Sequence, residues 1–220
     1  MDFFTILSAP RAGSNLLCGL LDSHPIARCH NEIFHHESVG LVLPKCKKIN
    51  QLFDKDWRDH SPSLFIEEML KKTQYFSRRT LRAVGCKILL NEDQINKGLA
   101  AIFEFNPRII FLTRRNKLAW YSSQQIAACT GIWMTAKQSE QQQCIFFDEA
   151  TFMQMVNQQE ALEEAVFAKV KAQGLTYLKI TYEDLADPTR ISNILNFLGL
   201  PNTQLFVDIA KQNTSQILDR

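Results

Sequence analysis

Short runs of consecutive apolar residues alternate along the chain with longer stretches in which apolar residues recur every three or four positions. The first pattern is typical of strands buried on both faces of a parallel sheet, and the second is typical of amphipathic helices. The runs predict strands at residues 3–7, 82–90, 108–113 and 175–181, with a short extended segment at 26–34. The periodic stretches predict helices at 14–24, 62–76, 91–105, 117–129, 151–173, 188–198 and 203–211.

Prolines, glycines and short polar residues mark several of the expected helix ends. Ser61 and Pro62 are expected as the N-cap and the first residue of one helix, and Asn91 as the cap of another. Gly174 is expected to end the long helix that begins at Thr151. The helix at 62–76 is predicted to bury one face, formed by Leu64, Phe65, Met69 and Leu70.

Strands that alternate with helices predict an α/β fold with three layers, in which helices flank a mainly parallel central sheet. At 220 residues, the chain suits a single domain over residues 1–220. The weak pattern at 39–59 is interpreted as a long connection, with a helix-bearing lid as one interpretation. Ligands of such sheets bind beyond the carboxyl ends of the strands, so we expect the functional residues in the loops that follow the strands.

The amino-acid composition indicates the general class of protein but not the reaction or the ligand. Apolar residues make up 45% of the chain, charged residues 22%, and the formal net charge is +2. This composition is ordinary for a soluble globular protein. The net charge is too small to imply binding to nucleic acid or to a membrane by itself, so any anion site has to be local. The first apolar run is short and lacks a basic leader, so we expect neither signal peptide nor transmembrane segment. Six scattered cysteines without metal-binding spacing are interpreted as reduced thiols, which favours a cytoplasmic protein.

Residues 8–17 join the first predicted strand to the first predicted helix. A short glycine-containing loop between a strand and a helix places backbone N–H groups and a helix N-terminus against an anion. Gly13 permits close approach, Arg11 contributes a charge, and the Ser14 hydroxyl can bind an anionic oxygen. The alternative is an ordinary turn in which Ser14 is only an N-cap. No lysine precedes Ser14, which argues against an Mg²⁺-dependent nucleotide-binding loop.

A second candidate anion site lies at residues 109–123, where a strand ends in Arg114 and a helix carries Ser122 eight residues later. The two side chains converge if the loop between them folds back. Arg115 and Ser123 have the same spacing, so the register stays open. A surface cluster of arginines near a helix start is the alternative interpretation.

Residues 11–17 with 22–25, and residues 111–122, resemble the 5′-phosphosulfate loop and the 3′-phosphate site of the sulfotransferases that use 3′-phosphoadenosine 5′-phosphosulfate (PAPS). The stretches 182–185 and 196–201 resemble that family's carboxyl-terminal signature, whose role is mostly structural. Residues 31–34, Gly85, Lys87 and residues 130–133 resemble the bacterial Stf0 and the nodulation or lipopolysaccharide type of carbohydrate sulfotransferase. The resemblance extends from residue 3 to about residue 212 and implies a P-loop-like fold.

The resemblance implies a site without a metal ion. The donor's 5′ end is expected on Arg11, Ala12, Gly13, Ser14 and Asn15. Arg114 and Ser122 are expected to bind its 3′-phosphate. Glu32 is the expected catalytic base. His35 and His36 are the second choice for the base, and the alternative is that they line the acceptor site. Two positions depart from the family pattern: Asn15 replaces a hydroxyl residue, and Asn116 replaces a proline.

The predicted function is therefore transfer of a sulfuryl group from PAPS to a hydroxyl of a carbohydrate or glycolipid. The alternatives are a P-loop nucleotide kinase and a non-catalytic protein that binds adenosine phosphates or glycans. Lys87 either faces the donor or lies at a strand edge, and Trp133 either stacks on a sugar or packs on the core. The basic run at 45–48 is interpreted as a solvated face or a steering patch. The acceptor and the oligomeric state do not follow from the sequence.

Overall fold

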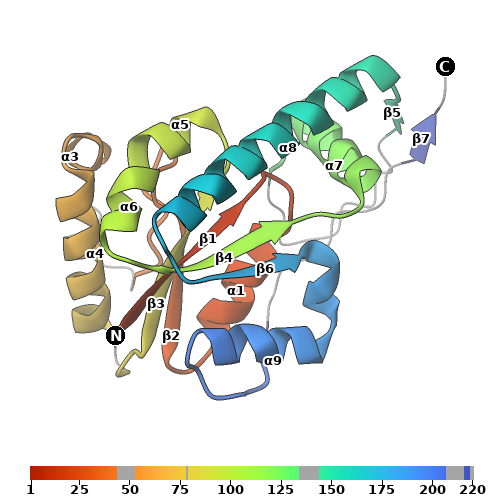
Figure 1. Cartoon of the computed structure of the whole chain (residues 1–220). Helices are drawn as coiled ribbons and strands as arrows, with labels where there is room; N and C mark the ends of the chain where they lie inside the picture. Colours follow the sequence, from red (N-terminus) through yellow and green to blue (C-terminus); the bar gives the residue numbers. More distant parts are fainter. Residues whose placement is uncertain (44–52, 78, 134–143, 207–215, 219–220) are drawn as a thin grey trace.

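The structure, a computed structural model, describes residues 1–43, 53–77, 79–133, 144–206 and 216–218. Its centre is a sheet of five parallel strands in the order β2-β3-β1-β4-β6 (Figure 1). Their bounds are β1 Asp2–Ser8, β2 Ala27–Glu32, β3 Ala83–Leu89, β4 Arg108–Thr113 and β6 Tyr177–Thr181. All four predicted strands are confirmed, the extended segment at 26–34 contains the fifth, β2, and the sheet is parallel as expected.

Helices cover both faces of this sheet and complete three layers (Figure 1). Alternate residues of β1 point to opposite faces, which is why its apolar run is continuous. Phe3 and Leu7 join the core beneath α4 (Pro62–Phe76), α6 (Ala100–Glu104) and α8 (Glu149–Ala172). Phe4 and Ile6 join the core beneath α1 (Ser14–Ser23) and α9 (Pro188–Phe197).

The remaining elements are short or lie at the ends of the sheet. The predicted helix after Asn91 is built from α5 (Glu92–Gln94), a π-helical turn η1 (Ile95–Leu99) and α6, and the Asn91 side chain accepts a bond from the backbone N–H of Gln94. Helix α7 (Lys117–Thr130) follows β4, the 3₁₀ turn η2 (Tyr182–Ala186) follows β6, and α3 (Lys55–His60) precedes α4. Because all five strands are parallel, their carboxyl ends meet at one edge, where the loops after β1, β2, β3 and β4 come together.

Several local expectations were wrong. Leu64 is 58% exposed, and Ile66 and Thr73 are buried in its place, because the apolar stripe of α4 is rotated by about one residue. Ser61 is the N-cap of α4 and Pro62 its first residue, as expected, although the Ser61 side chain makes no cap bond. Helix α8 begins at Glu149 behind the cap Asp148, two residues earlier than expected. Residues 203–206 are not helical, and residues 207–211 of that predicted helix lie outside the described residues.

A second, two-stranded parallel sheet was not predicted at all. It pairs β5 (Cys144–Phe146) with β7 (Gln216–Leu218). The basic run at 45–48 and the polar stretch at 137–143 lie outside the described residues. Within the described chain, no helix combines the length and the apolar character needed to cross a membrane.

Candidate active site

The loop between β1 and α1 presents an uncapped helix N-terminus at the carboxyl edge of the sheet. Gly13 is the N-cap residue, with φ 92°, and no side chain caps the first turn of α1. Arg11 also adopts a positive φ, 63°. Ser14 is the first residue of the helix, not its cap, and it is buried. The backbone N–H groups of a first turn have no partners within their own helix, so this end is suited to an anion.

The aromatic ring of Tyr182, the first residue of η2, links the two candidate anion sites. A Cβ atom on Gly13 would lie 2.4 Å from Cδ2 of Tyr182, so the ring packs directly against the loop. The guanidinium of Arg114 lies over the same ring, 4.7 Å from its centre. The sequence assigned this stretch a mostly structural role, and the structure shows that it contacts both arginine-bearing loops.

Arg11 and Arg114 come together at this loop. Arg11 Nε donates to Ser123 Oγ at 2.9 Å, and Arg11 Nη1 donates to the backbone oxygen of Trp133. Arg114 Nη1 donates to the backbone oxygen of Arg11 at 3.1 Å. Burial and the nearby charge of Arg114 lower the pKa of the Arg11 guanidinium, and burial lowers the pKa of Arg114. Two like charges that disfavour each other in this way are stabilised together by a bound anion.

The structure separates Arg114 from its neighbour. The Arg115 side chain is 66% exposed and lies 3.7 Å from Glu183 and 3.8 Å from Asp184, outside the loop. Arg114 Nε, in contrast, is buried with no hydrogen-bond partner among the described residues. On α7, Ser122 is buried, while Ser123 is the serine that contacts Arg11. Arg114 thus lies nearest the loop, as the register Arg114 with Ser122 predicted. The serine bonded to Arg11, however, is Ser123, which belongs to the alternative register with Arg115.

Helix α7 holds the loop through residues that the sequence analysis did not single out. Trp120 Nε1 and Gln124 Nε2 donate to the backbone oxygen of Pro10 at 2.8 and 3.3 Å. Their spacing of four residues puts both on one helix face, which is the sequence signal that could have indicated a shared partner. Asn116, where the family has proline, caps this helix by accepting a bond from Ala119 N at 2.9 Å. The departure from the family pattern therefore still starts α7.

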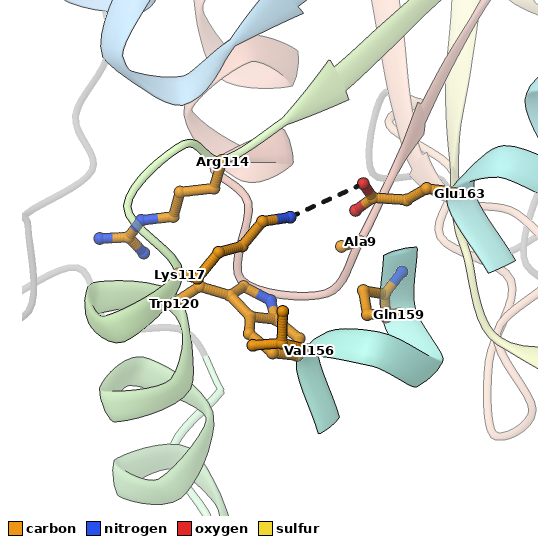
Figure 2. Close-up of a pocket in the computed structure, with 7 residues that line it drawn as sticks. All are labelled: Ala9, Arg114, Lys117, Trp120, Val156, Gln159 and Glu163. Atoms are coloured by element: carbon orange, nitrogen blue, oxygen red, sulfur yellow. Dashed lines mark ion pairs between the residues drawn. The ribbon is translucent and has the colours of Figure 1, made fainter. Parts of the chain in front are cut away.

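A small polar pocket lies behind the loop, between α7 and α8 (Figure 2). Lys117 contacts Glu160 at 3.1 Å and Glu163 at 4.0 Å, so an ion-pair network joins the two helices. Burial raises the pKa of Glu163. In Figure 2 the Arg114 guanidinium points away from Glu163, toward the opposite side of the α7 start. The ion pairs of Lys117 thus hold the start of α7 against α8. Arg114 takes no part in these ion pairs, and its guanidinium lies on the side of the loop.

Glu32, at the carboxyl end of β2, is held by two residues from neighbouring elements. Its carboxylate lies 3.1 Å from Lys87 Nζ and accepts a bond from Gln94 Nε2 at 2.8 Å. Lys87 is buried and also donates to Asn15 Oδ1. Asn15, the second departure from the family pattern, thus links the α1 N-terminus to Glu32 through Lys87. Gln94 was not predicted, because its role arises only when α5 folds against β2.

His35 lies in the loop after Glu32 but faces other partners. Its ring is 4.5 Å from the ring of His36, and its Nδ1 accepts a bond from Glu37 N at 3.2 Å. Possible ligand atoms of His35, His36 and Glu37 lie close together. The side chain of His35 thus interacts within its own loop and makes no contact with Glu32 among the described hydrogen bonds and ion pairs.

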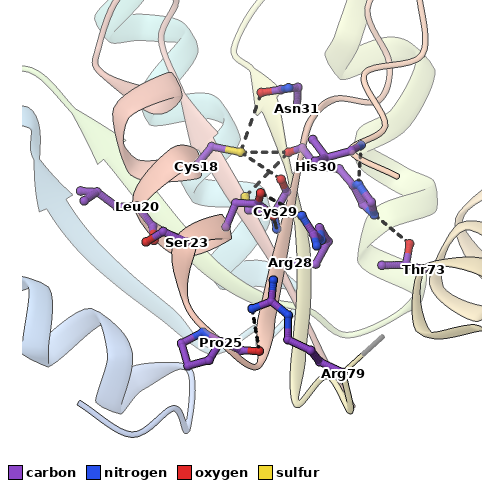
Figure 3. Close-up of polar contacts among 12 residues, drawn as sticks. Cys18, Leu20, Ser23, Pro25, Arg28, Cys29, His30, Asn31, Thr73 and Arg79 are labelled. Carbon is purple, nitrogen blue, oxygen red and sulfur yellow. Dashed lines mark hydrogen bonds and ion pairs between the residues drawn. The ribbon is translucent and has the colours of Figure 1, made fainter. Parts of the chain in front are cut away.

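His30 and the thiols of Cys18 and Cys29 lie buried around β2 and form hydrogen bonds there (Figure 3). His30 Nδ1 accepts a bond from Val42 N at 3.0 Å, and its Nε2 lies 2.8 Å from Thr73 Oγ1. Burial lowers the pKa of His30 to about 3. The Cys18 thiol bonds the backbone oxygen of His30 at 3.2 Å, and burial raises the pKa of Cys86 to about 12. His30 and Cys86 are therefore neutral near pH 7.

We expect the free energy of unfolding to decrease as pH falls from about 6.5 toward 4.5. In that range the unfolded chain protonates His30 and the folded chain does not, so each pH unit removes up to about 1.4 kcal/mol. Above about pH 6.5 the residue is neutral in both states and the contribution is complete. Urea unfolding at stepped pH should show a flatter dependence for His30→Gln than for the exposed control His60→Gln. Equal slopes in the two variants would contradict the assignment.

No curated protein matches the chain. The family model of the Stf0 sulphotransferases matches residues 3–218. The match begins in β1 and ends in β7, so it includes the loop, Glu32 and both arginines. Because the match covers nearly the whole sequence, the protein belongs to the Stf0 sulphotransferase family, and sulfotransfer is the activity that membership implies.

Proposed function

We propose that the protein transfers a sulfuryl group from PAPS to a hydroxyl group of a carbohydrate or glycolipid. The observation that carries the proposal is the meeting of Arg11 and Arg114 at an uncapped helix N-terminus. The buried Arg114 Nε without a partner among the described residues supports an anionic ligand at this point. PAPS carries an anionic group at each end of its ribose, which suits two neighbouring arginines.

The residues of the loop are proposed to bind the donor. The backbone N–H groups of Gly13, Ser14 and Asn15 and the Ser14 hydroxyl would hold its 5′ end, as helix N-termini hold phosphates elsewhere. The N–H of Ala12 instead bonds the backbone oxygen of Ala9 at 3.2 Å, so Ala12 would only shape the loop. Arg114, together with Ser122 of α7, would hold the 3′-phosphate. Arg11 would contact the oxygen that becomes the leaving group, and one donor aimed at developing charge contributes about 10²–10³ in rate.

Glu32 is proposed as the base that receives the acceptor's proton. When bound, the donor supplies a sulfuryl group that the acceptor oxygen attacks as the bond to the bridging phosphate oxygen breaks. Lys87 and Gln94 hold both oxygens of the Glu32 carboxylate, which fixes its direction before the acceptor arrives. Positioning of this kind is the main contribution that a protein makes to an in-line group transfer.

Trp133 supports a sugar as the acceptor class. It is 52% exposed, so its side chain is not buried in the core, and its backbone oxygen contacts Arg11, which puts the residue beside the loop. An exposed aromatic face next to a polar site is suited to the apolar face of a sugar ring.

Calorimetry with adenosine 3′,5′-bisphosphate, the desulfated product, tests the donor site. We expect tight binding in the presence of chelator, weakened about 10- to 150-fold in Arg114→Ala, because a charged hydrogen bond contributes about 1.5–3 kcal/mol. Arg115→Ala is the matched control and should change the affinity less than about twofold, since its exposed side chain pairs with Glu183 and Asp184.

Two outcomes would favour the alternatives. Binding of Mg²⁺-ATP without a response to the bisphosphate would replace the proposal with a phosphotransferase. Normal bisphosphate binding without turnover on any acceptor would identify a non-catalytic binding protein.

A further inference from the structure

Arg58 of α3 is a fully buried arginine whose partners come from the loop after Glu32. Its Nη1 donates to the backbone oxygens of Ile33 at 3.0 Å, His35 at 2.8 Å and Ser38 at 3.0 Å. Its Nε donates to Asp59 at 2.7 Å, and its side chain has no exposed surface. The guanidinium thus lies inside the curve of a single loop.

The backbone closes the same loop around Glu32. Asn31 N donates to Gly40 O at 2.8 Å, and Gly40 N donates to Glu32 O at 3.2 Å. A Cβ atom on Gly40 would lie 2.8 Å from both the backbone nitrogen and the backbone oxygen of Glu32, so only glycine permits this return. The chain therefore leaves Glu32, curves around Arg58 and returns to the Glu32 backbone.

A general role in core stability does not account for this arrangement. A buried guanidinium is costly, the more so here because Nη2 of Arg58 has no hydrogen-bond partner among the described residues, and an apolar side chain would fill the core more cheaply. The three carbonyl oxygens that bond Arg58 all belong to residues 33–38, and none belongs to the sheet. Phe34, from the same loop, packs its ring 5.7 Å from the guanidinium. The contacts of the Arg58 guanidinium therefore stabilise the conformation of one loop, residues 33–38.

We propose that Arg58 is a positioning residue for Glu32. By bonding three carbonyl oxygens of residues 33–38, it fixes the loop that leaves Glu32 and keeps the carboxylate against Lys87 and Gln94. The importance of that position for turnover rests on the proposed function of Glu32. Arg58 itself contacts neither substrate nor reacting atoms.

Arg58→Met tests the proposal, because methionine keeps much of the volume and removes every donor. The matched control is Arg28→Met, on the same strand as Glu32, which removes the 2.9 Å pair with Asp22 and leaves the loop intact. Amide hydrogen exchange is the first readout. The amides of His35 and Gly40 should exchange at least about tenfold faster in Arg58→Met than in Arg28→Met, while the Leu17 amide in α1 keeps its rate.

Kinetics provide the second readout. In Arg58→Met, kcat should fall at least about tenfold, while the dissociation constant of the bisphosphate stays within about twofold, since the donor loop is not part of the Arg58 contacts. Arg58→Lys keeps the charge and some donors, so it should restore part of kcat and of the loop protection; it also carries the test if Arg58→Met does not fold.

The outcomes separate this proposal from the function of Glu32. Unchanged exchange at His35 and Gly40 in both Arg58 variants would overturn the positioning role, even if Glu32→Gln proved inactive. Faster exchange at these amides would support it. If kcat then stayed normal in Arg58→Met and in Glu32→Gln, the proposed base would fail while the structural part of the inference stood.

Discussion

Glu32→Gln is expected to lower kcat by about 10²–10⁴-fold and to leave the affinity for adenosine 3′,5′-bisphosphate within about twofold. The amide has nearly the same shape as the carboxylate but does not accept the proton that the acceptor hydroxyl loses. Its oxygen still bonds Lys87, so the link from Glu32 through Lys87 to Asn15 is kept. A loss in kcat without a loss in donor affinity is the signature of an interaction made in the transition state.

Transfer of labelled sulfate to a panel of glycans measures this effect. Gln94→Leu is the companion variant: it removes the 2.8 Å bond to the carboxylate but keeps the base, so we expect only about a tenfold loss. His35→Gln should change kcat less than a few fold, because its ring contacts His36 and Glu37. If Glu32→Gln kept a tenth or more of the activity while His35→Gln lost it, the base would be His35.

The strands with nearly continuous apolar runs were predictable because a strand covered on both faces has few polar positions to interrupt it. β4 is the clearest case, with Ile109 through Leu112 all buried. The helices that cover the sheet were predictable from their apolar stripes, but their exact faces were not. Leu64 belongs to a stripe that fits two neighbouring rotations of α4, and only contact with the sheet selects the one that buries Ile66.

The strands β5 and β7 had no comparable signal. Each has three residues, and their pairing joins segments separated by about 70 positions. Short strands are defined by their partners, which a local pattern does not contain. The same reasoning explains why residues 203–206 were wrongly expected to be helical: apolar spacing over so few residues fits more than one structure.

The candidate site residues also fall into those with a local sequence signal and those without one. Arg11, Gly13 and Ser14 could be proposed from the sequence because an anion loop is local in sequence, with fixed spacing between a strand and a helix. Gln94 and Tyr182 were missed as site residues because each acts on an element far away in the sequence, at Glu32 and at Gly13. A buried arginine such as Arg58 has no sequence signal at all, since charged residues in a helix normally face water.

Gly13→Ala is expected to weaken bisphosphate binding at least about 100-fold. The new methyl group would meet the Tyr182 ring at 2.4 Å, and a φ of 92° is a conformation that alanine rarely adopts. Either the loop or the ring has to move. Movement of the ring displaces Arg114, which lies over it, and movement of the loop turns the first N–H groups of α1 away from the anion. Loss of one charged hydrogen bond together with the N–H contacts is about 3 kcal/mol or more, which gives the expected factor.

Gly174→Ala separates the clash from backbone strain. Gly174 has a similar positive φ, 65°, yet nothing lies within 4 Å of its added Cβ, so its variant should lose about 1 kcal/mol of stability and keep full affinity. Thermal unfolding of both variants, followed by calorimetry on the folded protein, makes the comparison. If Gly13→Ala bound the bisphosphate as tightly as Gly174→Ala does, the loop would tolerate the displacement and could not be the donor's anchor. If it lost binding while remaining folded, the contact between Gly13 and Tyr182 would be required for the anion site, because Gly174→Ala carries a comparable backbone strain without the clash.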